Sequence, residues 1–231
     1  MATTYNNLYL DIRQQLRRAG IEEATLEARE LVCFGTNKSR EELARDGGLY
    51  ASPELEHRVR DLVRRHLEGE PVAYLIGEWE FYGLPLDISR DVLIPRPETA
   101  ELVELIVEEN PNARRLLDIG TGSGCIAISL DKKLPDAKVE AWDISEEALA
   151  IARKNNDALE ARVRFLQRDV LADDWEKIPS FDVIVSNPPY VTETEKNEMD
   201  ANVLEWEPGL ALFVPDEDPL RFYNRIARLG S

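Results

Sequence analysis

The sequence has few cysteines and histidines, two of each among its 231 residues. Cys33 and Cys125 are far apart and stand in apolar surroundings, which predicts inert, reduced thiols in the protein interior. His57 and His66 lie in a charged helical stretch, where we expect solvated side chains. Because neither histidine has a cysteine or histidine partner at metal-ligand spacing, the sequence predicts no metal site.

Long apolar runs are also absent. No run reaches the roughly 18 residues that indicate a membrane-spanning helix. The N-terminal stretch MATTYNNLYLDIRQQ lacks the basic and apolar segments of a secretory signal. We therefore expect a cytoplasmic protein without membrane contact. The apolar fraction of 43% is ordinary for a globular chain.

Positive charge is scarce, since the net charge is −17. Residues 1–75 carry 11 basic and 13 acidic side chains, whereas residues 76–231 carry 17 basic and 32 acidic ones. Duplex DNA is bound mainly through basic surface. The acid excess therefore argues against direct nucleic-acid binding, and it weakly favours a cationic ligand.

The first third of the chain is predicted to be helical. Residues 1–72 have apolar residues at helical spacing and capping signals at Ser39 and Ser52, which predicts four short helices in a small bundle. Residues 73–98 are predicted to form a β-hairpin linker. The stretch AYLIGEWEFYGLPLDIS carries the hairpin pattern, with its turn near Tyr82 to Pro85.

An α/β domain is predicted over residues 99–231. A helix is expected to begin near Thr99, after an extended segment that prolines fix. Four strand patterns, RRLLDIG, KVEAWDIS, VRFLQRD and FDVIVSN, then alternate with helical patterns. This rhythm predicts a parallel sheet with helices on both faces. A ligand in such a fold lies beyond the carboxyl ends of the strands.

A glycine-rich loop follows the first of these strands. Glycine adopts backbone conformations that are closed to other residues, so such a loop can approach a ligand closely. The spacing is G-x-G-x-G rather than the G-x-G-x-x-G of dinucleotide sites. A tight turn without a ligand is the alternative. The candidate cofactor-binding residues here are Gly120, Thr121, Gly122, Ser123 and Gly124.

Acidic residues end the next two strands. Asp143, about 20 residues past the glycines, can accept both ribose hydroxyls of an adenosine, in NAD or in S-adenosylmethionine. Asp169 can accept from the adenine amino group, with Val170 against the ring. As alternatives, either acid caps a helix or a turn.

The fourth strand ends in Asn187-Pro188-Pro189-Tyr190. Each proline fixes φ and removes an N–H donor, so the nearby carbonyls stay available. The Asn187 side-chain oxygen and the Pro188 carbonyl can then accept both hydrogens of one external NH₂ group, with the Tyr190 ring stacked against it. A planar amide or an exocyclic amine is the natural guest. A rigid loop without a special role is the alternative.

These motifs resemble those of class I S-adenosylmethionine-dependent methyltransferases that act on planar nitrogen. Within that class the whole chain resembles the HemK/PrmC family, the peptide-chain release factor glutamine N5-methyltransferases. The combination of IPRPET with NPPY is specific, whereas NPPY alone also occurs in adenine-N6 DNA methyltransferases. The stretches that carry the resemblance are EPVAYLIGEWEFYGLPL, VLIPRPET, LLDIGTGSGCIAISL, VSNPPYV and EWEPGLALF.

The resemblance implies a Rossmann-like methyltransferase sheet and a release factor as the protein substrate. It implies S-adenosyl-L-methionine as the cofactor and S-adenosyl-L-homocysteine as the product. Cofactor contacts are implied at the glycine loop and at Asp143, Asp169, Val170 and Asn187. Substrate contacts are implied at Asn187, Pro188, Pro189 and Tyr190, of which Asn187, Pro188 and Tyr190 would be catalytic. The cleft would also be lined by Arg96, Pro97 and Glu98, to which no role is assigned.

The resemblance also predicts that the chain is C-terminally incomplete. In the family, the helix that matches DPLRFYNRIARLGS leads into a fifth strand and then a terminal strand pair. We therefore expect four of the usual seven strands, with the fourth at an open edge. The stretch ALFVPDED also departs from the glycines that the family often has there.

Other functions compete with methylation of a release factor. A ribosomal-protein glutamine is a near alternative as the substrate. An adenine-N6 nucleic-acid methyltransferase fits NPPY but not the acidic charge. A binding module that keeps the cofactor pocket without catalysis is a third reading, and an NAD dehydrogenase would lack hydride-handling residues. We expect a monomer, and we hypothesise that residues 1–72 dock the protein substrate.

Overall fold

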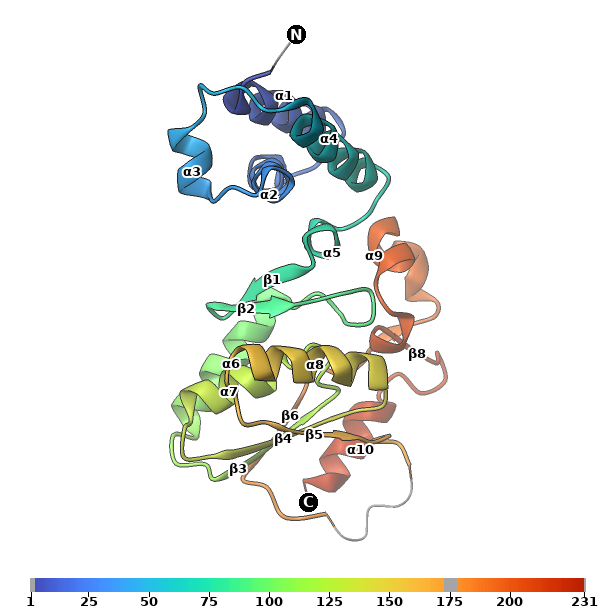
Figure 1. Ribbon diagram of the computed structural model, residues 1–231. Helices are drawn as coiled ribbons and strands as arrows, with labels where there is room; N and C mark the ends of the chain where they lie inside the picture. The colour runs from blue at the N-terminus through green and yellow to red at the C-terminus, as the bar shows by residue number, and fades with distance from the viewer. Residues whose placement is uncertain (1–2, 173–177, 231) are drawn as a thin grey trace. The chain divides into compact units, whose positions relative to one another are not determined.

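The computed structural model describes residues 3–172 and 178–230, and the chain divides into two compact units, Met1–Ile76 and Gly77–Ser231. Hydroxyl side chains at Thr4, Ser39 and Ser52 cap helices of the first unit by accepting from the backbone N–H three residues later. Figure 1 labels the helices of this unit, which are α1 (Tyr5–Arg18), α2 (Ala24–Thr36), α3 (Arg40–Arg45), α4 (Pro53–Leu67) and α5 (Val72–Ile76).

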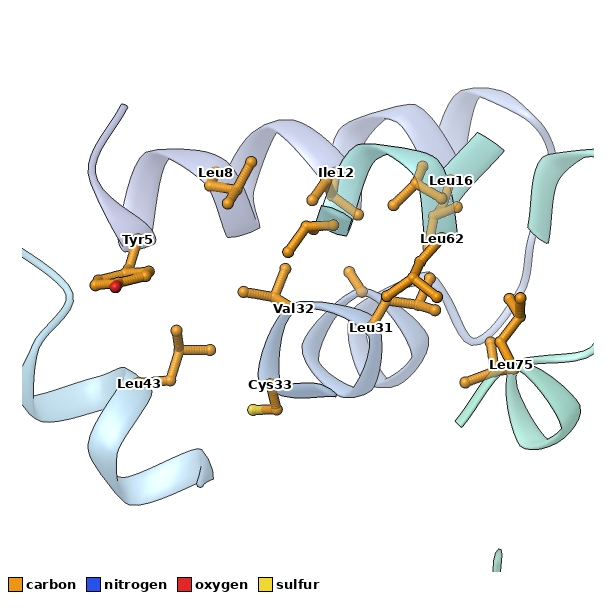
Figure 2. Close-up of a cluster of buried hydrophobic side chains, with 14 of the residues drawn as sticks. Tyr5, Leu8, Ile12, Leu16, Leu31, Val32, Cys33, Leu43, Leu62 and Leu75 are labelled. Carbon is orange, nitrogen blue, oxygen red and sulfur yellow. The ribbon is translucent and has the colours of Figure 1, made fainter. Parts of the chain in front are cut away.

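The first unit has a core of its own, formed where the apolar faces of its helices meet. Figure 2 shows Leu8, Ile12 and Leu16 in a row along α1, on the side that faces α2. Helices α2 and α4 approach closely at Gly35, where an added Cβ would lie 2.5 Å from Cγ2 of Val59. Residues at i, i+4 spacing share one face of a helix, so the pattern that predicted the helices also identifies the side chains that are buried.

The expectation that His66 is solvated is wrong. His66 is 8% exposed, because it lies on the inward face of α4. Its Nε2 is 2.9 Å from Oε2 of Glu27, and its Nδ1 is 2.9 Å from the carbonyl oxygen of Glu70. Burial lowers the pKa of His66, but the hydrogen bonds to Glu27 and Glu70 outweigh it and raise the pKa above its usual value.

The second unit is built on a parallel sheet with strand order β5-β4-β3-β6 in the described residues. Its strands are β3 (Arg115–Ile119), β4 (Lys138–Asp143), β5 (Arg164–Gln167) and β6 (Val183–Ser186). Its larger helices are α6 (Pro97–Glu109), α7 (Cys125–Lys133), α8 (Glu146–Ala158) and α10 (Arg221–Leu229). The predicted α/β fold is confirmed. No helix in the described residues is long and apolar enough to cross a membrane.

Side chains that alternate along β3 enter two different cores. Leu116 packs in a cluster with side chains of α6 and α7. Leu117 and Ile119 belong to a second cluster with Trp142, against which Phe222 of α10 packs. Because successive side chains of a strand point to opposite faces, helices cover both faces of the sheet, as predicted.

The hairpin and the next helix begin elsewhere than expected. The residues AYLI, expected in the hairpin, belong to α5 instead. Strand β1 (Glu78–Phe81) pairs with β2 (Leu84–Asp87) through a two-residue turn at Tyr82 and Gly83, both with positive φ. Helix α6 starts two residues before Thr99, because a proline suits the first position of a helix.

An unpredicted arrangement follows β6. Strand β7 (Val191–Thr192) pairs in parallel with β8 (Phe213–Val214). Between them lie η1 (Glu195–Glu198), α9 (Ala201–Trp206) and η2 (Gly209–Ala211). This pairing brings the residues before β8 next to the segment that directly follows Tyr190.

Candidate active site

A cavity of about 660 Å³ lies at the carboxyl ends of the parallel strands. Residues that follow each strand line it, among them Gly120 after β3, Ile144 after β4, Arg168 after β5 and Asn187 after β6. Strands β3 and β6 are neighbours although β4 and β5 intervene in sequence, so the strand order reverses here. The cavity therefore has the location predicted for a ligand in such a sheet.

The glycine loop borders this cavity. Gly120, Gly122 and Gly124 have φ values of 73°, 54° and 82°, which favour glycine. A Cβ at Gly120 or Gly122 would meet no protein atom within 4 Å, whereas one at Gly124 would lie 3.0 Å from Cδ1 of Ile128. The residues from Gly120 to Ser123 line the cavity, and Gly124 instead permits close packing under the loop.

Asp143 connects the end of β4 to the glycine loop. Its Oδ2 accepts from the backbone N–H of Gly122 at 2.9 Å, and its Oδ1 accepts from that of Ser145 at 3.0 Å. Ser145, rather than Asp143, caps α8 by accepting from Ala148. The carboxylate lines the cavity, and its oxygens have lone pairs left for hydroxyl groups of a ligand.

Asp169 and Val170 follow β5 and line the same cavity. Oδ1 of Asp169 accepts from the backbone N–H of Leu171 at 2.8 Å, so the carboxylate stabilises a turn as well. Val170 is buried, and its carbonyl accepts from Nε of Arg225 at 3.0 Å. Arg225 lies on α10, and Phe222 of the same helix lines the cavity. Sequence reasoning missed this contribution of α10.

Asp118, which opens the glycine motif, is fully buried. Its Oδ2 accepts from Oγ1 of Thr121 at 2.7 Å, while Oδ1 has no hydrogen-bond partner among the described residues. Burial raises the pKa of Asp118 to about 7, against the effect of the Thr121 hydrogen bond and with help from nearby Asp143. Sequence reasoning assigned this carboxyl no role, although it stands directly before the loop.

Strand β6 delivers the NPPY residues to the cavity. Asn187, Pro188 and Pro189 line it, and Oγ of Ser186 ties the strand end to the Ile119 carbonyl at 2.6 Å. The Asn187 side chain is half-buried and has no hydrogen bond to another described residue. Tyr190 is 58% exposed and is not among the lining residues. The cavity thus combines the Asn187 and Pro188 acceptors with the glycine loop.

The IPRPET residues divide between the cavity and the surface. Arg96 lines the cavity, whereas Pro97 and Glu98 are exposed in the first turn of α6 and do not, contrary to expectation. Arg96 forms an ion pair with Glu207, whose side chain is 2% exposed. Nothing in the sequence predicted a role for Glu207, although the stretch EWEPGLALF that contains it carries part of the family resemblance.

The lining fits the cofactor that the resemblance implies. Gly120 and Gly122 leave open space for close approach, and the Asp143 carboxylate can accept from hydroxyl groups. Apolar lining at Val170 and Phe222 suits a flat ring. Burial raises the pKa of Cys125 to about 12, so this thiol stays protonated. No group of metal-ligating side chains is found in residues 3–172 and 178–230.

Two family models match the chain. Residues 7–77 match the model described as the PrmC N-terminal domain, and residues 97–205 match that of the methyltransferase small domain. Together they include the helical unit and most of the cavity-lining motifs.

Curated relatives described as release factor glutamine methyltransferases are similar along much of the chain. The protein of Bacteroides thetaiotaomicron is 69% identical over 172 residues, which are 74% of this chain and 62% of the relative. That of Flavobacterium psychrophilum is 50% identical over 71% of this chain and 59% of the relative. That of Koribacter versatilis is 42% identical over 87% of this chain and 72% of the relative. The chain thus spans about three fifths of the length of the first two relatives.

A solved structure supports the fold. The hMettl16 catalytic domain in complex with the MAT2A 3'UTR hairpin 1 aligns with a TM-score of 0.51 and 22% identity. The alignment covers 64% of this chain and 56% of that chain. At this identity the likeness concerns the fold alone.

Proposed function

This chain belongs to the family of the release factor glutamine methyltransferases, and from that membership we propose that it methylates the side-chain amide nitrogen of a protein glutamine. The methyl donor is S-adenosyl-L-methionine, and the product is S-adenosyl-L-homocysteine. The observation that carries the proposal is the Asn187 and Pro188 acceptor pair in one cavity with the glycine loop. The names of the relatives favour a glutamine of a release factor as the substrate, and the family resemblance implies the glutamine of its Gly-Gly-Gln loop.

One side of the cavity binds the cofactor. The loop from Gly120 to Gly124 lets the backbone approach it closely. Asp143 accepts from the ribose hydroxyls, Asp169 accepts from the adenine amino group, and Val170 lies against the ring. When bound, the cofactor supplies a methyl group activated by a sulfonium. The support for these roles is that Gly120 to Ser123 and all three of the other residues line one cavity.

The NPPY residues hold the substrate glutamine. The Asn187 side-chain oxygen and the Pro188 carbonyl accept the two hydrogens of the glutamine NH₂ group, and this orients its nitrogen toward the cofactor. Pro189 keeps the backbone rigid. The Tyr190 ring packs against the bound glutamine, which covers part of a residue that is 58% exposed in the chain alone.

Asn187 and Pro188 also favour the reaction itself. An amide nitrogen is a poor nucleophile, because its lone pair is delocalised. The two acceptors stabilise the positive charge that develops on the nitrogen in the transition state. Holding both reactants in line contributes about 7–11 kcal/mol to lowering the barrier. The amide proton leaves after the attack, so no carboxylate is assigned as a general base.

The test is methyl transfer from radiolabelled S-adenosyl-L-methionine to a release factor, beside the same release factor with the loop Gln→Ala substitution. We expect label in the first protein and none in the second. Label that appears in a ribosomal protein instead would identify a different glutamine substrate. Cofactor binding by calorimetry without transfer to either protein would contradict the proposed activity. The monomeric state, the cytoplasmic location and the lack of direct nucleic-acid binding stay predictions.

A further inference from the structure

Glu207, in the short connection between α9 and η2, is a buried carboxylate with a specific set of partners. Its side chain is 2% exposed. Oε1 accepts from Nη2 of Arg96, and Oε2 accepts from the backbone N–H of Ile94 at the longer distance of 3.4 Å. A buried carboxylate is costly unless it is paired in this way. Glu207 therefore fixes the segment around Pro95 and the orientation of Arg96.

Arg96 keeps unused donors next to the cavity. A guanidinium has five N–H donors in one plane and no acceptor. Nη2 of Arg96 is engaged by Glu207, and no other hydrogen bond from this side chain to a described residue is found. The side chain is 39% exposed and lines the cavity. It is thus a fixed cation with free donors at a ligand-sized space.

The β7–β8 pairing connects the segment of Glu207 to the segment where the substrate amide is proposed to bind. Strand β7 directly follows Tyr190 and pairs with β8, which brings the residues before β8 next to the NPPY segment. Pro208, the residue after Glu207, lines the cavity together with Asn187 and Pro188. Of the acids proposed to hold the adenosine, Asp143 ends β4 and Asp169 follows β5.

We propose that Arg96, positioned by Glu207, donates a hydrogen bond to the carbonyl oxygen of the substrate carboxamide. The inference rests on the proposed function and deepens it. Asn187 and Pro188 supply acceptors for the amide NH₂ group, and the amide oxygen then needs a donor as it leaves water. A planar guanidinium held by a buried carboxylate supplies one in a fixed direction. An amine has no such oxygen, so Arg96 makes the site selective for a carboxamide.

The experiment compares Arg96→Lys and Glu207→Gln with the wild-type chain. The first keeps the charge and loses the planar fork, and the second keeps the shape and loses the charge. We expect each to lower kcat/KM for the release factor about 10- to 100-fold, as for the loss of a hydrogen bond to a charged group. The Kd of the release factor for the chain loaded with S-adenosyl-L-homocysteine should rise, while the Kd of that cofactor product alone stays within about twofold of wild type.

Two further variants serve as matched controls. Glu205→Gln removes one negative charge from an exposed residue two positions before Glu207, and we expect wild-type kinetics. Arg90→Lys alters another arginine of the cavity lining, whose guanidinium stacks 3.8 Å from the ring centre of Trp206, the residue before Glu207. If Arg90→Lys lowers kcat/KM and Arg96→Lys does not, the donor is Arg90 and the proposal is wrong.

Two measurements separate the proposed role from a purely structural one. Added guanidinium ion should restore part of the activity of Arg96→Ala without stimulating the wild type. The double variant with Arg96→Met and Glu207→Met buries no unpaired charge, so it should bind cofactor normally and still lose activity. The proposal is overturned if the wild type methylates the release factor and Arg96→Lys and Glu207→Gln match Glu205→Gln. Absence of transfer by the wild type would instead contradict the proposed function.

Discussion

The two units differ in how they treat buried polar side chains. In the first unit, both ring nitrogens of His66 have partners, and the buried Thr36 hydroxyl donates to the Val32 carbonyl at 2.6 Å. Every buried side-chain nitrogen or oxygen without a partner, among the described residues, lies in the second unit. These atoms are Oδ1 of Asp118, Oγ of Ser123, Oγ of Ser129 and Nε1 of Trp206.

Most of these atoms lie at or near the cavity. Ser123 lines it, Asp118 lies directly before the glycine loop, and Trp206 stacks with the cavity residue Arg90. Ser129 is inside α7 and has no such relation to the lining. Buried polar groups in folded proteins are nearly always paired, so these exceptions are unusual. The first unit thus pairs its buried polar side chains internally, whereas most of the unpaired atoms of the second unit lie at or near the cavity.

The largest effect expected from a single substitution is at Asn187. Asn187→Ala removes one of the two proposed acceptors for the substrate NH₂ group, so kcat should fall about 100-fold or more. The substitution should leave the fold intact, because the side chain bonds to no described residue. Methyl-transfer kinetics with cofactor calorimetry as the control would check this. Unchanged kcat would mean that this acceptor plays no part in the chemistry.

Removing the first unit tests whether the two units also have separate functions, substrate docking in the first and cofactor binding in the second. Each unit has its own buried core, so residues 77–231 should fold without residues 1–76. If the first unit docks the protein substrate, its deletion should raise KM for the release factor about tenfold or more, while cofactor Kd stays nearly constant. Calorimetry and steady-state kinetics on the shortened chain would measure both. A lost cofactor site would contradict the docking role.

The raised pKa of Asp118 predicts a pH-dependent stability of the second unit. The folded-state pKa of about 7 lies above the usual value of an aspartate carboxyl, so this carboxyl stabilises the fold at low pH. That contribution is lost progressively as the pH rises from the usual aspartate pKa to the folded-state pKa of about 7, with a slope of at most about 1.4 kcal/mol per pH unit. Asp118→Asn should remove the slope. All four tryptophans follow residue 76, so urea unfolding monitored by tryptophan fluorescence would detect it. Parallel pH profiles of wild type and variant would contradict the prediction.

His66 predicts a pH-dependent stability of the first unit as well, with a smaller effect than Asp118 has in the second. Its pKa is raised, so its contribution to stability is present at low pH and is lost as pH rises through the folded-state pKa. The effect should be smaller than at Asp118, because the pKa of His66 is displaced less from its usual value. Urea unfolding of His66→Gln and wild type, monitored by circular dichroism between pH 5.5 and pH 8.5, would measure it. A change in the cofactor Kd of His66→Gln would contradict the view that the first unit has no part in cofactor binding.

The sequence predicted which residues meet at the cavity better than it predicted the burial of single side chains and the ends of helices. Glycine, acidic and NPPY residues each follow a strand, and parallel strands bring their carboxyl ends to one edge, so their convergence follows from the alternating pattern. The inward orientation of His66 was missed, because a charged neighbourhood in sequence does not show which helix face is buried. The start of α6 at Pro97 was missed by two residues, since a proline fits both an extended segment and a first helical turn.

The sequence by itself determined the alternation of strands and helices, the capped helical unit and the motifs that follow the strands, because these depend on local periodicity and backbone chemistry. Tertiary structure alone decided that Arg96 meets Glu207 across 111 residues, that α10 holds Val170 through Arg225, and that the Asp118 carboxyl is fully buried. Such contacts depend on how distant segments pack. Burial is what raises the pKa of Asp118 and makes the ion pair of Glu207 with Arg96 necessary, and no local sequence pattern encodes that burial.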